Sequence, residues 1–381
     1  MLNIVAAILL FGFIVLVHEF GHFLLAKLNG IGVVEFSIGM GPRLVSLVKT
    51  NGTYKVKLLA RPEADALAPE SETTVYSLKL LPFGGSCMMV GEDSDVEHPD
   101  PNAFGNKPVF ARILVIAAGP VFNFILAFLF AIVIVGAVGH DAPVLYGVTE
   151  GSPAQEAGIQ AGDRITKING RKIYAYRDVQ LYTFSHPGEQ MVIHYERPAD
   201  GTWETKGAFE KRSVTLTPAY SQEYQTYLIG VQFRGYEKVH GIGELISDSV
   251  YEVRYCVVST FDSIRMLVHR QVKVDEAISG PVGIVGMVGE TVQEGREVGT
   301  KAVILVLSNW VLLLSSSLGI MNLLPIPALD GGRLLFLLIE LVRRKPTDPK
   351  IENAVHMAGM MVLMALMVLV LFNDISKLII R

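Results

Sequence analysis

The sequence predicts a helical membrane protein that crosses the bilayer about four times and has a small β-rich domain outside it. Half of the 381 residues are apolar and only 18% are charged, against roughly 25% charged residues in a soluble globular domain. Four long stretches contain few or no charges, and a helix needs about 20 such residues to cross the hydrocarbon core. A long polar segment with frequent turn signals separates the second stretch from the third.

The charge and cysteine content exclude several other classes. Lys and Arg number 33 and Asp and Glu number 37, so the net charge is −4 and there is no basic excess to favour a nucleic-acid partner. Cys87 and Cys256 lie in different segments. We therefore expect neither a disulfide framework nor a cysteine-based metal site.

The predicted transmembrane helices cover residues 1–28, 111–139, 301–342 and 354–373. The first could be mistaken for a signal peptide, but it lacks a basic start and a clear cleavage site, so we expect it to be retained. The loop at 343–353 contains four basic residues and should be cytoplasmic. Residues 29–110 then lie in the cytoplasm, and the termini and the segment after the second span lie outside.

The segments between the spans have their own organisation. In residues 141–235, short alternating runs at 163–168, 192–195 and 213–216 are separated by Gly and Asn-Gly turns, which predicts a small β-rich domain. Residues 236–300 form a helical linker, amphipathic over 242–272, that can lie at the membrane interface. The cytoplasmic loop contains strand candidates near 53–59 and 73–81 and a Pro-, Ala- and acid-rich insertion at 61–72.

The strongest chemical signal is the pentapeptide HEFGH at residues 18–22, inside the first span. On a helix His18 and His22 project from one face and can bind a single Zn²⁺. Glu19 is placed to take a proton from the attacking water as a general base. Ionisable groups inside a span are costly and usually functional. The alternative is that the three residues are only hydrogen-bonded members of the core.

A catalytic zinc needs a third protein ligand, and the spans offer two candidates. Asp330 follows Pro325 and Pro327, which break the third span, and such broken backbone is tolerated where it lines a wet cavity. Asp330 could instead form an ion pair with Arg333. His356 in the fourth span is the other candidate ligand, unless it only faces the bundle interior.

HEFGH in the first span and NLLPIPALDGG in the third resemble the site-2 protease family of intramembrane zinc metalloproteases, in particular its bacterial RseP/RasP-type subgroup. The resemblance implies that His18, His22 and Asp330 bind zinc and that Glu19 is catalytic. Asn322 would contact the substrate backbone, unless it only caps the broken helix. In the second span, AGPVFN ends at Asn123, which could serve the site or only link helices.

The resemblance also implies a fold and a task. The fold is a polytopic helical membrane protein with a membrane-associated β-region, whose edge near LPFGG (81–85) would hold a substrate strand, and one extracytoplasmic PDZ-like α+β domain at 141–235. Its carboxylate-binding loop would be Tyr146-Gly147-Val148. The implied substrates are single-span proteins of the bacterial inner membrane, such as anti-sigma factors or remnant signal peptides, already trimmed by an upstream site-1-type protease.

The sequence departs from the family pattern at three places. Ser86-Cys87-Met88 follows the double glycine, Ser317 replaces a frequent asparagine, and the insertion at 61–72 lengthens the loop. None of these places includes an implied zinc ligand. Two rival functions remain as alternatives, a catalytically silent scaffold that binds partners through the PDZ-like domain and a metal transporter. The intact Glu19 and Asp330 favour the protease.

Overall fold

The computed structural model describes residues 2–50, 53–59, 74–92, 100–199, 209–272 and 280–380. The insertion predicted at 61–72 lies outside these ranges. The chain divides into two compact units, which we describe separately. The membrane unit comprises residues 1–130 and 274–381, and the α+β unit comprises residues 131–273.

Four helices in the described residues are long and apolar enough to cross a membrane, which confirms the predicted number of spans. They are α1 (Leu2–Leu28), α2 (Val109–Val138), α8 (Thr300–Leu323) and α10 (Pro349–Ile380). Large apolar side chains along α10 are exposed, among them Met361, Val362 and Leu369. Their exposure is expected of a helix that faces lipid rather than water.

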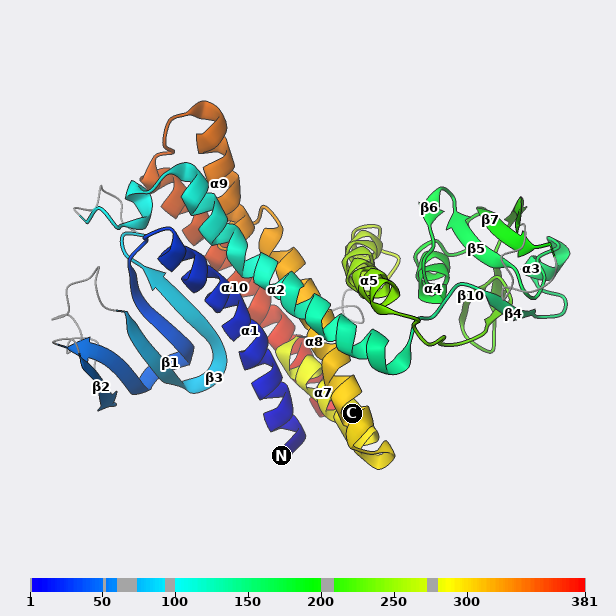
Figure 1. Ribbon diagram of the computed structural model, residues 1–381, viewed down its shortest axis with the longest axis horizontal. Coiled ribbons are helices and arrows are strands. Elements are labelled where there is room, and N and C mark those ends of the chain that lie inside the picture. The colour runs from blue at the N-terminus through cyan, green and yellow to red at the C-terminus, as the bar shows by residue number, and fades with distance from the viewer. Residues whose placement is uncertain are drawn as a thin grey trace. The chain divides into compact units, whose positions relative to one another are not determined.

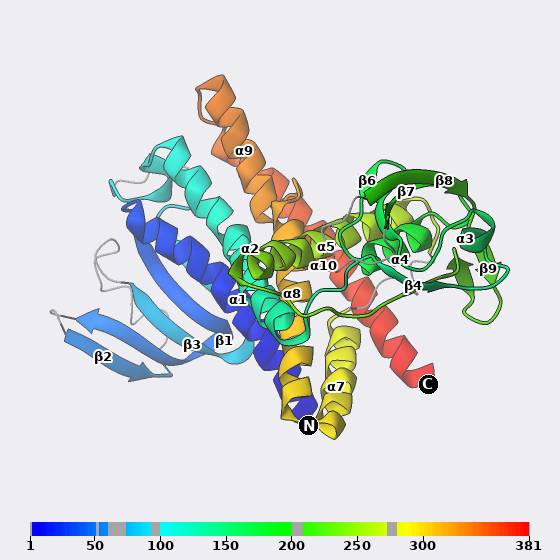
Figure 2. The same ribbon diagram turned by 45° about the vertical axis from the view of Figure 1, so that its right-hand side comes forward.

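Two shorter α-helices and a 3₁₀ turn, η2 (Phe104–Asn106), also lie in the described part of the membrane unit. α7 (Pro281–Val298) packs beside α1 and α8 near the start of α1 (Figure 2). α9 (Asp330–Arg343) follows α8 after a non-helical break that contains both prolines. A Cβ atom on Gly331 would lie 2.0 Å from the carbonyl oxygen of Leu324. Only glycine therefore lets α9 begin directly against the break, and this fixes where Asp330 lies.

A strongly bent sheet, ordered β2-β1-β3, lies beside α1 in the membrane unit (Figure 1). Its strands are β1 (Val33–Thr50), β2 (Thr53–Leu58) and β3 (Val75–Met89). The chain turns within β1 at Gly39 and Gly41, which have positive φ angles of 86° and 87°. Both arms of β1 therefore pair with β3, as when Ser37 and Ser46 both face Ser77. The predicted strands near 53–59 and 73–81 are confirmed.

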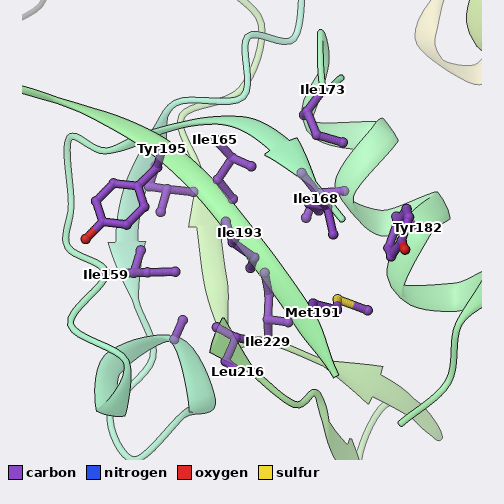
Figure 3. Close-up of a cluster of buried hydrophobic side chains, with 13 residues drawn as sticks. Ile159, Ile165, Ile168, Ile173, Tyr182, Met191, Ile193, Tyr195, Leu216 and Ile229 are labelled. Atoms are coloured by element: carbon purple, nitrogen blue, oxygen red, sulfur yellow. The ribbon is translucent and has the colours of Figure 1, made fainter. Parts of the chain in front are cut away.

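The core of the α+β unit is a four-stranded antiparallel sheet, ordered β6-β5-β7-β8, with helix α4 (Tyr176–Ser185) packed beside it (Figure 3). Ile165, Ile168 and Ile193 are completely buried there. The remaining elements are short. The strands and short helix of this unit are β4 (Leu145–Val148), α3 (Pro153–Glu156), β5 (Arg164–Ile168), β6 (Arg171–Lys172), β7 (Met191–Pro198), β8 (Phe209–Leu216), β9 (Ala219–Ser221), β10 (Thr226–Leu228) and β11 (Val231–Phe233).

The segment predicted as one helical linker is divided between the two units. α5 (Ile242–Val268) belongs to the α+β unit and confirms the amphipathic helix expected there, whereas α7 belongs to the membrane unit. The polar face of α5 contacts the sheet domain through ion pairs such as Glu252 with Arg177. Its apolar residues Ile242, Val250 and Phe261 are exposed.

Candidate metal centre

Helix α1 places two imidazole rings one turn apart in the interior of the membrane unit. His18 is 7% exposed and His22 is 6% exposed. Their Nε2 atoms lie 3.2 Å from each other. The i, i+4 spacing of the HEFGH sequence therefore brings the two nitrogens to one point, as expected for a helix.

Asp330, the first residue of α9, completes a group of three converging side chains. Its Oδ2 atom lies 3.1 Å from Nε2 of His18 and 3.4 Å from Nε2 of His22. One ligand atom from each of the three residues lies within 4.8 Å of the others. Arg333 forms an ion pair with Glu92, so the alternative pairing of Asp330 with Arg333 is not what the structure shows.

His356, the other candidate for the third ligand, lies outside this group. Its Nδ1 atom accepts a hydrogen bond of 2.9 Å from the backbone N–H of Ala328. Ala328 has a φ of 74° in the break before α9, a conformation that costs energy for a residue with a side chain. His356, which lies on the neighbouring helix α10, thus stabilises the segment that positions Asp330.

Helix α2 covers the other side of the imidazole rings with residues 115, 119 and 123. Nδ1 of His22 lies 2.9 Å from the carbonyl oxygen of Val115. Because a carbonyl oxygen only accepts, Nδ1 of His22 carries the proton and Nε2 keeps its lone pair. A Cβ atom on Gly119 would lie 2.3 Å from Nε2 of His22, so α2 approaches the rings as closely as a helix backbone can.

Asn123 is completely buried and contacts the other ring. Its Nδ2 atom lies 3.1 Å from Nδ1 of His18. Its backbone carbonyl accepts a hydrogen bond of 2.8 Å from Ser315 on α8. Asn123 thus does both things that the sequence left as alternatives, since it adjoins the site and also forms part of a link between helices.

Glu19 lies next to the edge of the bent sheet. A Cβ atom on Gly85 of β3 would lie 3.1 Å from Cγ of Glu19 and 2.9 Å from the carbonyl oxygen of Ser37. Gly85 therefore lets the backbone of β3 approach the Glu19 side chain closely. This part of β3 therefore lies beside Glu19, the residue that follows His18.

Cys87, one of the residues at which the sequence departs from the family pattern, does not provide a reactive thiol at this edge. Its side chain packs with the cluster around Ile31, Val33 and Ile116. Burial first, and then the negative charge of Glu19, raise the pKa of the Cys87 thiol to about 12. The thiol stays protonated at neutral pH and is a poor nucleophile.

Two predicted substrate contacts are placed but not tested by the structure. Asn322 is half-buried, one residue before the end of α8, so it precedes the break that leads to Asp330. Tyr146, Gly147 and Val148 were expected to form a loop. They instead belong to strand β4, where Gly147 and Val148 pair with β11.

The converging residues fit zinc by their chemistry. Two imidazole nitrogens and one carboxylate oxygen are a ligand set that zinc enzymes use, with a further position open for water or substrate. Oδ2 of Asp330 is buried and makes no hydrogen bond with the part of the chain that the structure describes. A buried carboxylate oxygen of this kind requires a cation or a donor.

The supporting residues on α2 could have been found from their spacing. Val115, Gly119 and Asn123 are four residues apart, so they share one face of a helix. Sequence reasoning identified only Asn123 among them. The contribution of Val115 was missed because it comes from the backbone carbonyl group, which every residue has. The contribution of Gly119 was missed because it depends on the absence of a side chain.

Comparison with known proteins agrees with the geometry. Residues 6–61 and 66–366 match the family described as Peptidase family M50. A relative from Clostridium acetobutylicum is 33% identical over 376 residues, covering 98% of this chain and 97% of that one. Zinc metalloprotease RasP from Geobacillus kaustophilus is 32% identical, and Regulator of sigma-W protease RasP from Bacillus subtilis is 30% identical. Each alignment covers at least 98% of both chains.

A solved structure matches one segment only. The PDZ domain of a SdrC-like protein from Listeria innocua is 27% identical, with a TM-score of 0.19, and the match covers 26% of this chain and 99% of that domain. The family match and the full-length relatives span nearly the whole sequence. The chain therefore belongs to peptidase family M50 and is a multi-pass zinc metalloprotease.

Proposed function

We propose that this protease hydrolyses peptide bonds within or beside the transmembrane segments of membrane proteins. His18, His22 and Asp330 would hold the zinc ion, and Glu19 would act as general base. The observation that carries the proposal is the convergence of these three residues among apolar helices, with Glu19 beside them and β3 close to its side chain.

The chemistry divides between the metal and the chain. Bound zinc supplies a Lewis acid that polarises a carbonyl group and makes water a stronger acid. Glu19 takes a proton from the attacking water and delivers it to the amine that leaves when the C–N bond breaks. Both histidines are buried, and electrostatic interactions are stronger in such surroundings than in water.

Substrate binding is proposed at the free edge near Gly84 and Gly85. A transmembrane helix hides its carbonyl groups in internal hydrogen bonds, so it must unwind before attack. Pairing with the edge of β3 would replace the lost bonds by strand addition. Asn322 would hold the substrate backbone near the end of α8. Helix-destabilising residues in the substrate should therefore favour cleavage.

The proposed substrates are single-span proteins of a bacterial inner membrane. The name of the Bacillus subtilis relative refers to regulation of sigma-W, which favours membrane-bound anti-sigma factors, and remnant signal peptides are a further class. The termini and the α+β unit would lie outside the cell membrane, where that unit would screen substrates already cut by a site-1-type protease. The active site would face the cytoplasmic side.

The test is cleavage of a single-span substrate by the purified protein in detergent. Wild type is compared with Glu19→Gln, each with and without a zinc chelator. Glu19→Gln keeps the size of the side chain but not its basicity, so we expect its rate to fall at least about 100-fold. Chelation should abolish wild-type cleavage, and added zinc should restore it.

Other results would contradict the proposal. Equal cleavage by wild type and Glu19→Gln would show that Glu19 is not the base. Persistent cleavage after complete removal of zinc would show that the metal is not needed. Bound zinc without cleavage of any of a panel of single-span substrates would favour the silent scaffold.

A further inference from the structure

Asn123 contains a buried polar atom that its surroundings in the described chain do not satisfy. The residue is completely buried, and its Oδ1 atom has no hydrogen-bond partner among the described residues. A buried amide oxygen without a hydrogen-bond partner destabilises the fold. Such an atom requires an explanation, and Nδ1 of His18 is the ring nitrogen that contacts this side chain among the described residues.

The protonation of His18 decides which end of the amide should face the ring. A neutral imidazole has one N–H and one lone pair. If Nε2 of His18 is a zinc ligand, its lone pair is used there and the proton must be on Nδ1. The Nδ2 atom of Asn123 also carries only protons, so two donors would then face each other across 3.1 Å.

Exchanging the two ends of the amide removes this conflict. The oxygen and nitrogen ends of an asparagine have nearly the same size and shape, so the exchange needs no additional space. It places Oδ1, the atom that lacks a partner, opposite the Nδ1–H of His18. Both problems therefore have one solution.

We propose that Asn123 is a positioning residue that accepts a hydrogen bond from the Nδ1–H of His18 through Oδ1. This contact fixes the tautomer in which Nε2 of His18 directs its lone pair at the metal, and it also fixes the rotation of the ring. The inference rests on the proposed ligand role of His18. It gives His18 the support that the Val115 carbonyl gives His22, so both ligands are oriented from α2.

The position of Asn123 is itself fixed by the fold. Ser315 on α8 is completely buried and donates a hydrogen bond of 2.8 Å to the Asn123 carbonyl oxygen. The tight contact at Gly119 holds the same part of α2 against the rings. A side chain on a fixed backbone can orient a ligand, because its own freedom is already lost.

The test compares two substitutions that separate an acceptor from a donor. Asn123→Asp keeps two acceptor oxygens and loses the donor, whereas Asn123→Leu keeps the approximate size and loses both. Thr291→Val is the matched control, because Thr291 accepts a 2.8 Å hydrogen bond from Trp310 between α7 and α8, away from the ligands. The full-length variants are purified in detergent and their zinc affinity is measured by competition with a chromogenic chelator.

We expect Asn123→Leu to weaken zinc binding about 10- to 100-fold, the usual effect of losing a group that orients a metal ligand. Asn123→Asp should stay within about threefold of wild type, and Thr291→Val should not differ from it. The Co²⁺-substituted proteins should show the same order, with an altered visible absorption spectrum only for Asn123→Leu. Thermal unfolding in detergent identifies variants that do not fold.

Two results would overturn the inference. Wild-type zinc affinity in Asn123→Leu would show that the contact does not matter, and equal loss in Asn123→Asp and Asn123→Leu would show that Asn123 acts as a donor. If one variant does not fold, the other is compared with wild type alone: wild-type zinc affinity in Asn123→Leu, or a clear loss in Asn123→Asp, would overturn the inference. His18→Ala tests the proposed function separately: unchanged zinc affinity in that variant would overturn the ligand set, and this inference with it.

Discussion

Asp141 and Asp163 in the α+β unit have different partners from Asp330 in the membrane unit. In the α+β unit, Asp163 is paired with Arg197 at 2.6 Å, and Asp141 is paired with Arg177 at 2.9 Å. Both carboxylates are inaccessible to solvent. In the membrane unit, Asp330 faces two imidazole rings and is not paired with an arginine in the described chain.

The comparison distinguishes carboxylates that only stabilise the fold from a carboxylate that remains available for a function. A buried carboxylate that is matched by a guanidinium group needs nothing more. Asp330, which faces two imidazole rings and has no arginine partner in the described chain, is available to bind a cation, as proposed above. The difference is not due to the lack of an arginine nearby in the sequence. Arg333 lies one helical turn after Asp330, but it pairs with Glu92.

The largest effect should come from removing a matched arginine. Arg177→Met would leave Asp141 and Glu252 buried without the guanidinium that both contact. We expect the α+β unit to lose about 3–5 kcal/mol of its free energy of unfolding. Hydrogen exchange in α4 and α5 of the full-length protein measures this. The control is Arg212→Met, which removes an exposed pair with Glu210 and should change hydrogen exchange little, because exposed ion pairs contribute little to stability. Equal losses in both variants would contradict the comparison.

A single methyl group added at Gly119 should disrupt the proposed metal centre. Gly119→Ala would place a carbon 2.3 Å from Nε2 of His22 and 2.7 Å from Cε1 of His18, so α2 must move or the rings must rotate. We expect zinc affinity to fall at least about 100-fold, as for loss of ligand orientation. Gly136→Ala makes the same change on the same helix, where the nearest atom is 3.8 Å away. It should bind zinc as wild type does, and a loss of affinity in both variants would show a general effect on α2.

The smallest effect concerns pH and compares two matched carboxylates. Burial opposes ionisation of Glu35, but Arg43 and Lys79 hold its pKa below its usual value. Burial of Glu252 raises its pKa despite Arg177. Ionised Glu35 therefore stabilises the fold above the unfolded-state pKa of 4.5, and this contribution is lost as the pH falls. Glu252 has the opposite effect: it favours the fold below pH 4.5, and this contribution is lost as the pH rises.

The corresponding measurement is unfolding of two variants at pH 4 and pH 7. Relative to wild type, Glu35→Gln should be more destabilising at pH 7 than at pH 4. Glu252→Gln should change in the opposite direction and be more favourable at pH 7. If the effects of both substitutions on stability changed with pH in the same direction, the pKa values of Glu35 and Glu252 would not be shifted in opposite directions.

Much of the helical frame was predictable from the sequence, because length and lack of charge are sufficient to identify a span. The bent strand β1 was not predicted. Its glycines and Pro42 are typical of turns, and only pairing of both arms with β3 makes the segment a strand. Helix α7 was expected to belong to a linker because its composition does not distinguish a polar connector from a helix packed on α1.

Half of the candidate site was predictable for a simple reason. His18, Glu19 and His22 are local, so helical spacing alone brings them together. For the third ligand, the prolines before Asp330 favoured it over His356, but residue chemistry left both open, since both can bind zinc. Only the fold separates them, because the break after α8 turns Asp330 towards the histidines and leaves His356 to support Ala328.

The distance along the chain between the proposed zinc ligands has a consequence for the cell that makes this protein. His18 and His22 emerge from the ribosome first, whereas Asp330 is added roughly 300 residues later, which takes about 15–60 seconds at about 5–20 residues per second. Throughout that interval the nascent chain would present only two of its three proposed ligands. If these residues bind zinc, the order of synthesis would keep the new enzyme inactive until its own fold is complete.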